Sequence, residues 1–138
     1  MYLVDTSVWV DYLRGRATIP VVALRNLLAG EDIIGTAPLI LQEVLQGADS
    51  IERFESWKKS FSELLCYLPA DPIGSHIAAA RLYVECRKSG KTPRSSNDCL
   101  IAQIAIENRL VLIHNDKDFE TIASVAGELR LYPEGGTA

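Results

Sequence analysis

Residues 2–13 read YLVDTSVWVDYL, and the fold depends on the pattern in this stretch. Three apolar residues are followed by the polar turn Asp5-Thr6-Ser7, after which apolar residues recur at the three- and four-residue steps of a helix. The pattern therefore predicts a short buried strand, a tight turn and a helix that packs back on the strand.

The same alternation of strand and helix continues along the chain. Further strands are expected near residues 33–35, 66–68, 111–113 and 129–132, and further helices over 19–28, 38–47, 50–65, 71–88, 99–107 and 119–125. Short apolar strands alternating with helices are typical of a parallel sheet covered by helices on both faces. We therefore predict an α/β fold with three layers, formed as a single domain over residues 1–138. Ligands of such sheets bind at the carboxyl ends of the strands.

Composition excludes several classes of protein. The 138 residues include 14 Lys and Arg against 18 Asp and Glu, a net charge of −4, which argues against a module that binds nucleic acid by bulk positive charge. Three cysteines without Cys-x-x-Cys spacing indicate neither a disulfide framework nor a structural zinc site. Because no apolar stretch is long enough to cross a membrane, we expect a cytoplasmic protein.

Four acidic residues are expected at one edge of the sheet. Asp5 and Asp116 follow predicted strands, Asp98 opens a predicted helix, and Glu43 lies in the helix after the second strand. Any one of them could be a helix cap or a partner of the helix dipole. As a group, however, two carboxylates ~5 Å apart at an effective dielectric constant of ~20 repel by roughly 3 kcal/mol, so a cation is needed among them.

Oxygen ligands favour Mg²⁺ or Mn²⁺ over Zn²⁺. A divalent cation held by carboxylates can activate a water and orient an in-line attack on phosphorus. The acidic group therefore indicates phosphodiester or phosphoryl hydrolysis.

Four segments along the chain share an acidic residue in a defined context. They are Val4-Asp5-Thr6-Ser7, Glu43-Val44-Leu45-Gln46-Gly47, Asn97-Asp98-Cys99-Leu100-Ile101-Ala102 and Leu112-Ile113-His114-Asn115-Asp116-Lys117-Asp118-Phe119. In order and spacing they resemble the four acidic motifs of PIN-domain ribonucleases, in particular VapC-type toxins of type II toxin–antitoxin systems. The resemblance extends over residues 2–132. It implies a three-layer α/β/α PIN-like fold with a central parallel sheet, an Mg²⁺- or Mn²⁺-dependent endoribonuclease, a homodimer, and inhibition by a cognate VapB-type antitoxin.

The resemblance also implies a role for each acidic residue. Asp5, Asp98 and Asp116 would hold the metal, and Glu43 would either bind the metal or act as general base on the attacking water. The products would carry a 5′-phosphate and a 3′-hydroxyl. For Asp118 two roles stay open, a place beside the metal or a helix cap paired with Lys117.

Other polar side chains are candidates to support these acids or to bind substrate. The resemblance implies that Thr6 or Ser7 adds a hydroxyl near the metal or its waters. Asn97 and Asn115 suit an outer shell that orients carboxylates, although helix capping explains Asn97 equally well. The basic residues expected near the acidic edge are candidates to bind RNA phosphates, with Arg14 and Arg94 favoured and Arg16 and Lys91 assigned to solvated surface. His114 is assigned to packing at its strand end rather than to acid catalysis.

An apolar stripe has three possible uses. Ile51, Phe54, Trp57 and Phe61 follow one another at helical steps and could form core, a dimer surface or a wall of a groove for an antitoxin segment. In the third case Trp9 and Tyr12 would contribute to the same groove.

Two other functions compete with the nuclease interpretation. A metal-dependent phosphatase of haloacid-dehalogenase type also places an Asp after its first strand, but it needs a second Asp two residues later, where this chain has Ser7. A non-catalytic PIN-like module that only binds RNA or a partner would have no need of all four acids. When Asp5, Glu43, Asp98 and Asp116 are set aside, 14 acidic residues remain against 14 Lys and Arg. The net charge of −4 therefore equals the charge of the expected site. RNA binding should then depend on divalent metal.

Overall fold

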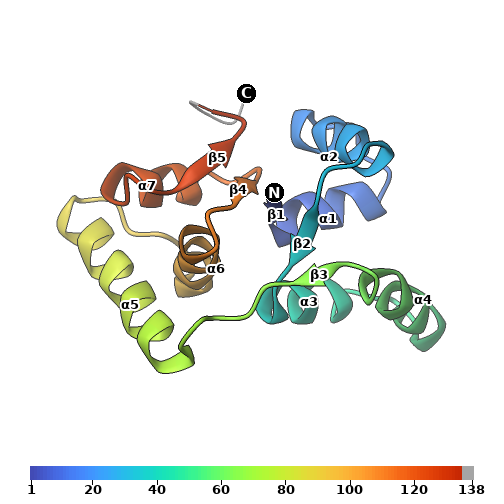
Figure 1. Cartoon of the computed structure of the whole chain (residues 1–138), viewed down its shortest axis with the longest axis horizontal. Coiled ribbons are helices and arrows are strands. Elements are labelled where there is room, and N and C mark those ends of the chain that lie inside the picture. The colour runs from blue at the N-terminus through green and yellow to red at the C-terminus, as the bar shows by residue number, and fades with distance from the viewer. Residues whose placement is uncertain (135–138) are drawn as a thin grey trace.

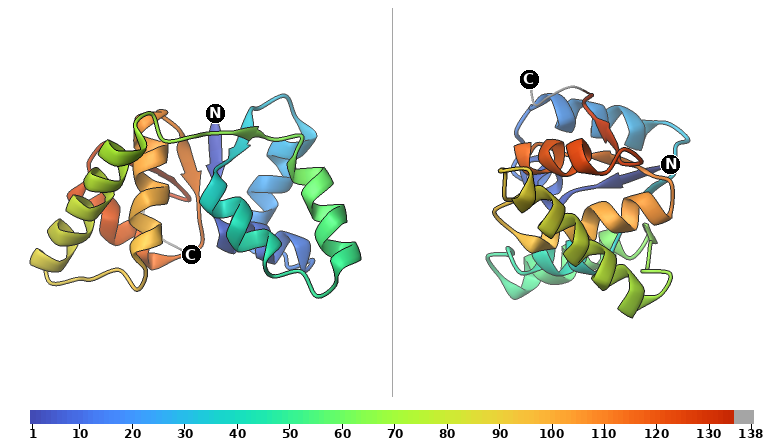
Figure 2. Two further views of the ribbon diagram at one scale, coloured as in Figure 1. Left: turned by 90° about the horizontal axis from the view of Figure 1, so that it is seen from below. Right: turned by 90° about the vertical axis from the view of Figure 1, so that its left-hand side faces the viewer.

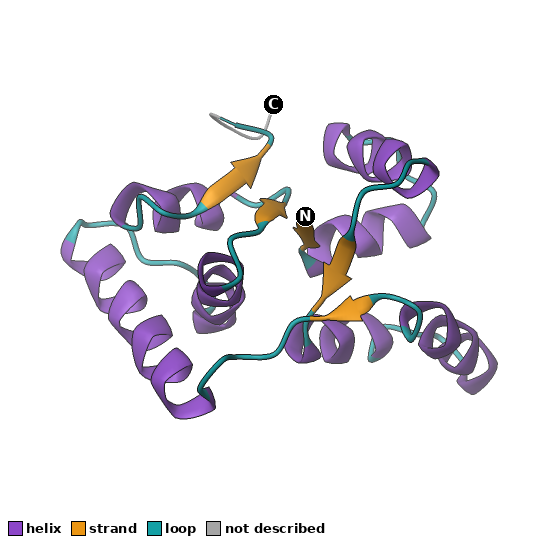
Figure 3. Ribbon diagram, in the orientation of Figure 1, coloured by secondary structure: helices purple, strands orange, loops and turns teal. Residues whose placement is uncertain are grey.

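A computed structural model describes residues 1–134, which form five strands separated by one or two helices each, seven helices in all (Figures 1 and 3). The elements are β1 (Tyr2–Val4), α1 (Thr6–Leu13), α2 (Ile19–Ala29), β2 (Ile34–Thr36), α3 (Pro38–Leu45), α4 (Ile51–Phe61), β3 (Leu65–Cys66), α5 (Pro72–Lys88), α6 (Ser96–Glu107), β4 (Val111–Ile113), α7 (Lys117–Val125) and β5 (Arg130–Tyr132). The strands form one parallel sheet in the order β3-β2-β1-β4-β5.

The helices lie in two groups on opposite faces of this sheet. Helices α1 to α4 cover one face and α5 to α7 cover the other, as Figure 2 shows. The chain adds β2 and β3 on one side of β1, then crosses to the other side of β1 to add β4 and β5. The direction of winding therefore reverses between β1 and β4, which is where open α/β sheets bind ligands. The predicted three-layer α/β/α fold with a central parallel sheet is confirmed.

The pairing of β1 with β4 holds the middle of the molecule. Leu3 pairs with Leu112 and Val4 with Ile113, and all four side chains are fully buried. The ladder extends one residue further, because the backbone N–H of Asp5 donates to the carbonyl oxygen of Ile113 over 2.9 Å. The backbone of Asp5 is thus part of the core sheet while its side chain points to the carboxyl edge.

Several boundaries differ from those predicted. Helix α4 ends at Phe61 rather than at residue 65, because the Ser62 hydroxyl donates to the carbonyl oxygen of Lys59 and closes the last turn. Strand β3 accordingly comes one residue earlier than predicted, at Leu65–Cys66. Helix α6 begins at Ser96, since the Ser95 hydroxyl caps it by accepting from the backbone N–H of Asn97. Asp98 therefore lies inside the first helical turn.

The apolar stripe of α4 divides between core and surface. Phe61 is buried, where its ring lies edge-on to Trp9 at a centroid distance of 4.9 Å. Trp57 and Phe54 are half-buried, and Ile51 is exposed. The stripe is thus partly core and partly surface.

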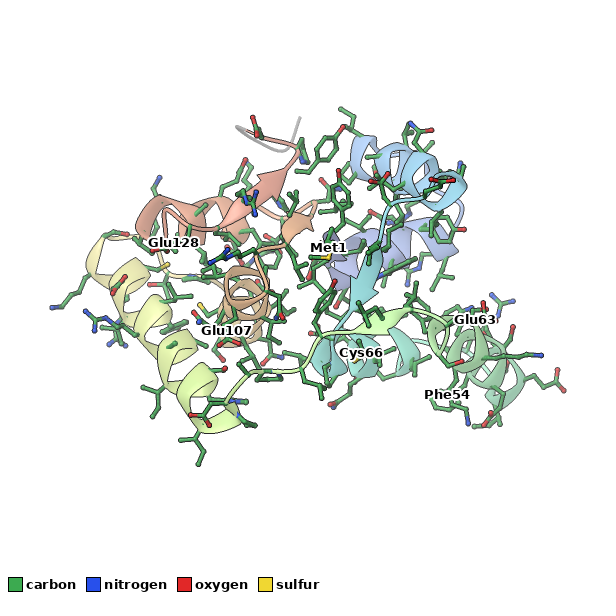
Figure 4. All side chains as sticks on the ribbon, viewed as in Figure 1. Met1, Phe54, Glu63, Cys66, Glu107 and Glu128 are labelled. Carbon is green, nitrogen blue, oxygen red and sulfur yellow. The ribbon has the colours of Figure 1, made fainter. Side chains whose placement is uncertain are left out.

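The crossover from β3 to α5 is tied to α6 through one carboxylate. Glu107, labelled in Figure 4, accepts hydrogen bonds from the backbone N–H of Ala70, the Ser75 hydroxyl and the Gln103 side chain. This contact fixes the start of α5 against the end of α6 and so carries the chain to the second face of the sheet. Within residues 1–134, no helix is both long enough and apolar enough to cross a membrane.

Candidate active site

The four predicted acids all lie at the carboxyl edge of the sheet. Asp5 follows β1 and caps α1, Asp116 follows β4 and caps α7, Asp98 lies in the first turn of α6, and Glu43 lies in α3. Asp5 and Glu43 come from the half of the fold that begins with β1, and Asp98 and Asp116 come from the half that contains β4, so the four acids flank the point where the winding of the chain reverses. The fold therefore brings together the four residues that the sequence motifs single out.

Asp5 is the most deeply buried of these acids, with only 5% of its surface exposed. Its carboxylate accepts hydrogen bonds from the backbone N–H of Ser7 (3.1 Å) and from the Ser7 hydroxyl (2.6 Å). Burial raises the pKa of Asp5 from 3.8 to about 6, although the bonds from Ser7 and Thr6 oppose this shift. Asp5 is thus a carboxylate whose charge the protein itself only partly compensates.

The neighbouring hydroxyl serves a second acid. Thr6 Oγ1 donates to Glu43 Oε1 over 2.8 Å, which links the first turn of α1 to the middle of α3. Thr6 and Ser7 were expected near the metal or its waters. In the structure each holds one carboxylate, Ser7 that of Asp5 and Thr6 that of Glu43.

Asp98 has the most strongly raised pKa among the acids of the site. Partial burial raises its pKa to about 7, with further contributions from the negative charges of Asp5, Asp116, Asp118 and Glu43. Because all four neighbours act on Asp98, it lies at the electrostatic centre of the group. A carboxyl shifted this far by burial together with neighbouring negative charges is typical of a functional site.

Three of the carboxylates are close enough to share one ion. One oxygen each from Asp98, Asp116 and Asp118 lies within 4.8 Å of the others. Hard oxygen donors of this kind fit Mg²⁺ or Mn²⁺. Asp118, whose role the sequence left open, joins this set, whereas Asp5 and Glu43 lie outside it but still act on Asp98 through space.

Arg94 pairs with two members of the acidic group. Its Nη2 donates to Asp116 Oδ1 (2.9 Å) and its Nε to Asp118 Oδ2 (3.2 Å), and its backbone N–H also donates to Asp118 Oδ2 (3.1 Å). The hydrogen bonds to Asp118 and Asp116 raise the pKa of the guanidinium above its ordinary value. The sequence does not predict these contacts, because no spacing rule connects a loop arginine to acids more than twenty residues away.

The remaining predicted residues lie at varying distances from this group. Asn115 lines a hollow of about 450 Å³ together with Arg94, Asp116, Lys117 and Asp118. Asn97 is exposed, and its backbone N–H contributes to the cap of α6. Arg14 lies at the far end of α1, in a separate hollow between α1, α3 and α4.

His114 has a structural role at the end of β4. Its ring is fully buried and lies edge-on to Phe119 at a centroid distance of 5.5 Å, and its Nδ1 lies within hydrogen-bond distance of the backbone of Asp116, 2.9 Å from the carbonyl oxygen and 3.2 Å from the nitrogen. Burial lowers the pKa of the imidazole, which favours the neutral form. This matches the predicted packing role, and the hydrogen bond also shapes the turn that carries Asp116.

The fold and the acidic edge together define a protein class. The PIN domain model matches residues 2–125, and the chain belongs to the PIN domain family. It is 37% identical over 129 residues to ribonuclease VapC11 from Mycobacterium tuberculosis, an alignment that covers 91% of this chain and 93% of that protein. The VapC ribonuclease Mb1587 from Mycobacterium bovis matches equally well. This identity places the chain among the VapC proteins of the family.

Solved structures share the same fold. VapBC2 from Rickettsia felis, bound to a DNA fragment from its promoter, matches with a TM-score of 0.72 at 23% identity, over 94% of this chain and 96% of that one. VapBC-5 from Mycobacterium tuberculosis, a member of the VapBC family of toxin–antitoxin systems, matches with a TM-score of 0.65 at 20% identity, over 94% and 95% of the two chains.

The raised pKa values of Asp5 and Asp98 predict how stability depends on pH without metal. Both values lie above 3.8, so the folded protein binds protons that the unfolded chain releases between about pH 4 and 7. The free energy of unfolding should therefore fall as the pH rises through this window. Asp98→Asn should flatten the fall and stabilise the protein at pH 8 by about 2 kcal/mol, measured by urea unfolding in EDTA.

The matched control is Asp32→Asn, which removes the same charge from an exposed position ahead of β2. This control should leave the pH dependence as in the unmodified protein. An unchanged slope in Asp98→Asn would show that Asp98 is not the group that binds the extra proton.

Proposed function

We propose that this protein is a metal-dependent endoribonuclease toxin that hydrolyses RNA phosphodiester bonds and is inhibited by a cognate antitoxin. One observation carries the proposal: the carboxylates of Asp98, Asp116 and Asp118 converge at the carboxyl edge of a PIN-domain sheet. Relatives that are 37% identical to this chain support the proposal, because those proteins are VapC ribonucleases.

The metal would be held by Asp98 and Asp116, with Asp118 and the buried Asp5 as the further carboxylates within reach of the same edge. When bound, Mg²⁺ or Mn²⁺ supplies positive charge that offsets the carboxylates, polarises a phosphoryl oxygen and lowers the pKa of a water. The raised pKa of Asp98 supports this assignment, since a group of acids that resists full ionisation alone is relieved by a cation.

Glu43 is the proposed general base. Thr6 donates to Oε1 and so fixes the carboxylate, while Oε2 can accept a proton from the attacking water. The water oxygen forms a bond to phosphorus as the bond to the 3′ oxygen breaks, which leaves a 5′-phosphate and a 3′-hydroxyl. Ser7 would serve the reaction indirectly by holding Asp5 in place.

Arg94 and Arg14 are the proposed RNA contacts. Arg94 pairs with the acids at the sheet edge, and Arg14 lines a separate hollow of about 460 Å³ between α1, α3 and α4 that also contains Arg53. Phosphate contacts of this kind position a nucleic acid without reading its sequence. A protein with a net negative charge can thus bind RNA through a few basic side chains at one place on its surface.

Cleavage of a structured RNA tests the nuclease proposal. The purified protein should cut RNA with Mg²⁺ or Mn²⁺ and should lose this activity in EDTA, because the carboxylates then have no ion to offset them. Asp5→Asn and Asp98→Asn should each lower the cleavage rate by about 100-fold or more, whereas Asp32→Asn should cleave normally. Cleavage that persists in EDTA, or in both site variants, contradicts the metal mechanism.

The antitoxin is proposed to bind an apolar hollow on the helical face formed by α1, α2 and α4. This hollow has a volume of about 410 Å³ between α1, α2 and α4, and the side chains that line it are Trp9, Tyr12, Leu13, Leu28, Trp57, Ser60, Phe61, Glu63 and Leu64. It adjoins the hollow that contains Arg14, since Leu13 and Trp57 line both. An amphipathic segment with apolar anchors fits such a groove.

Leu28 provides a test of the antitoxin groove. Leu28→Asp introduces a charge at an exposed position on the rim of the hollow, so it should weaken the antitoxin complex by at least about tenfold in a titration calorimetry experiment. The control is Val22→Asp, which places the same charge at an exposed position of the same helix outside the hollow. Equal affinities of both variants would argue against this groove.

A homodimer is also proposed, with α5 at its interface. Ile73 and Ile77 are 75% and 66% exposed and lie one turn apart on the same helix face. Ile77→Asp should shift the protein from dimer to monomer in light scattering, whereas Ile51→Asp, at an exposed position of α4, should not. A dimer unaffected by Ile77→Asp would exclude this face.

The proposed site of action is the cytoplasm.

A further inference from the structure

Arg94 lies across the mouth of the acidic group on its solvent side. Its side chain is 78% exposed, whereas those of Asp116 and Asp118 beneath it are only 21% and 15% exposed. The arginine can therefore swing away into solvent without unpacking the core, while the two carboxylates stay where they are.

The hydrogen bonds of Arg94 engage one oxygen of each of two carboxylates in the acidic group. Asp116 Oδ1 accepts from Arg94 Nη2 and also from the backbone N–H of Asp118, both over 2.9 Å. Asp118 Oδ2 accepts from both the Nε and the backbone N–H of Arg94. Two of the three carboxylates that could hold an ion are thus already engaged by one guanidinium.

The charges explain why this arrangement can be reversed. A single guanidinium offsets at most one negative charge of a group that contains five carboxylates, and its ion pairs reach only Asp116 and Asp118. A divalent cation supplies twice the charge at shorter range. Exposed ion pairs are individually weak. An ion that enters among the carboxylates can therefore displace the arginine, but its affinity is lowered by the competition.

We propose that Arg94 is a built-in counter-ion of the acidic group, which must leave Asp116 and Asp118 before a divalent cation can bind them. The inference rests on the proposed metal site. Metal binding is then an exchange of an arginine for an ion. The fraction of protein in the metal-bound form depends on Arg94 as well as on the ligands themselves.

Metal binding to the intact chain, without RNA or antitoxin, tests the exchange. Arg94→Gln should bind Mn²⁺ about tenfold more tightly than the unmodified protein, measured by electron paramagnetic resonance of the free ion. The matched control is Lys117→Gln, which removes a positive charge from the rim of the same hollow but no ion pair with either carboxylate among residues 1–134. The control should change the affinity by less than about threefold.

A second measurement follows the arginine directly. In the metal-free protein the Arg94 Nε–H should give a distinct, protected signal in nitrogen-15 NMR, because it is hydrogen-bonded to Asp118. Titration with Mg²⁺ should move this signal to the position of a free arginine. A signal that stays unchanged at saturating Mg²⁺ overturns the inference. So does an Arg94→Gln variant whose affinity for Mn²⁺ is no higher than that of the unmodified protein. An equal gain in Mn²⁺ affinity in Lys117→Gln overturns it as well.

Asp98→Asn separates this inference from the metal site on which it rests. The variant should lose Mn²⁺ binding whether Arg94 is present or replaced by Gln. If Asp98→Asn binds Mn²⁺ as well as the unmodified protein does, the metal site itself is wrong. If it loses binding while Arg94→Gln brings no gain in affinity, the metal site stands and the exchange is wrong.

Discussion

Repulsion between carboxylates at the carboxyl edge of the sheet is the constraint on which the rest of this structure depends. Asp5, Glu43, Asp98, Asp116 and Asp118 come from four segments of the chain, and the other four all act electrostatically on Asp98. Such a group destabilises a folded protein unless hydrogen bonds, dipoles and counter-ions offset it. Each of these compensations is visible in the local structure.

Helix N-termini contribute the first compensation. Asp5 and Asp116 cap α1 and α7, and Asp98 lies in the first turn of α6, so three of the acids are close to the positive end of a helix dipole. Hydroxyls contribute the second, through the bonds from Ser7 to Asp5 and from Thr6 to Glu43. Arg94 contributes the third. The pKa of Asp98 nevertheless remains raised, first through burial and then through the negative charges of its four acidic neighbours.

The sequence pattern predicted the elements well where apolar periodicity was long and strong. Strands β1 and β4 and helix α5 lie where the pattern put them, because runs such as Val111-Leu112-Ile113 have no other stable place than a buried strand. Boundaries set by one hydroxyl were less accurate. The Ser62 side chain ends α4 early and Ser95 starts α6 early, and a periodicity argument cannot weigh a single hydrogen bond of this kind.

The acidic quartet and its place at the sheet edge were determined by the sequence, because each acid follows a strand or enters a helix at a fixed offset and parallel strands end at a common edge. Tertiary structure alone decided which acids lie close enough together to share an ion and which basic side chain pairs with them. Asp118 lies close to Asp98 and Asp116, and Arg94 reaches Asp116 and Asp118 from a loop that precedes both by more than twenty residues. Those contacts depend on how α5, α6 and α7 pack together on one face of the sheet. Local sequence does not encode that packing, since it arises only when distant segments bury their apolar faces against one another.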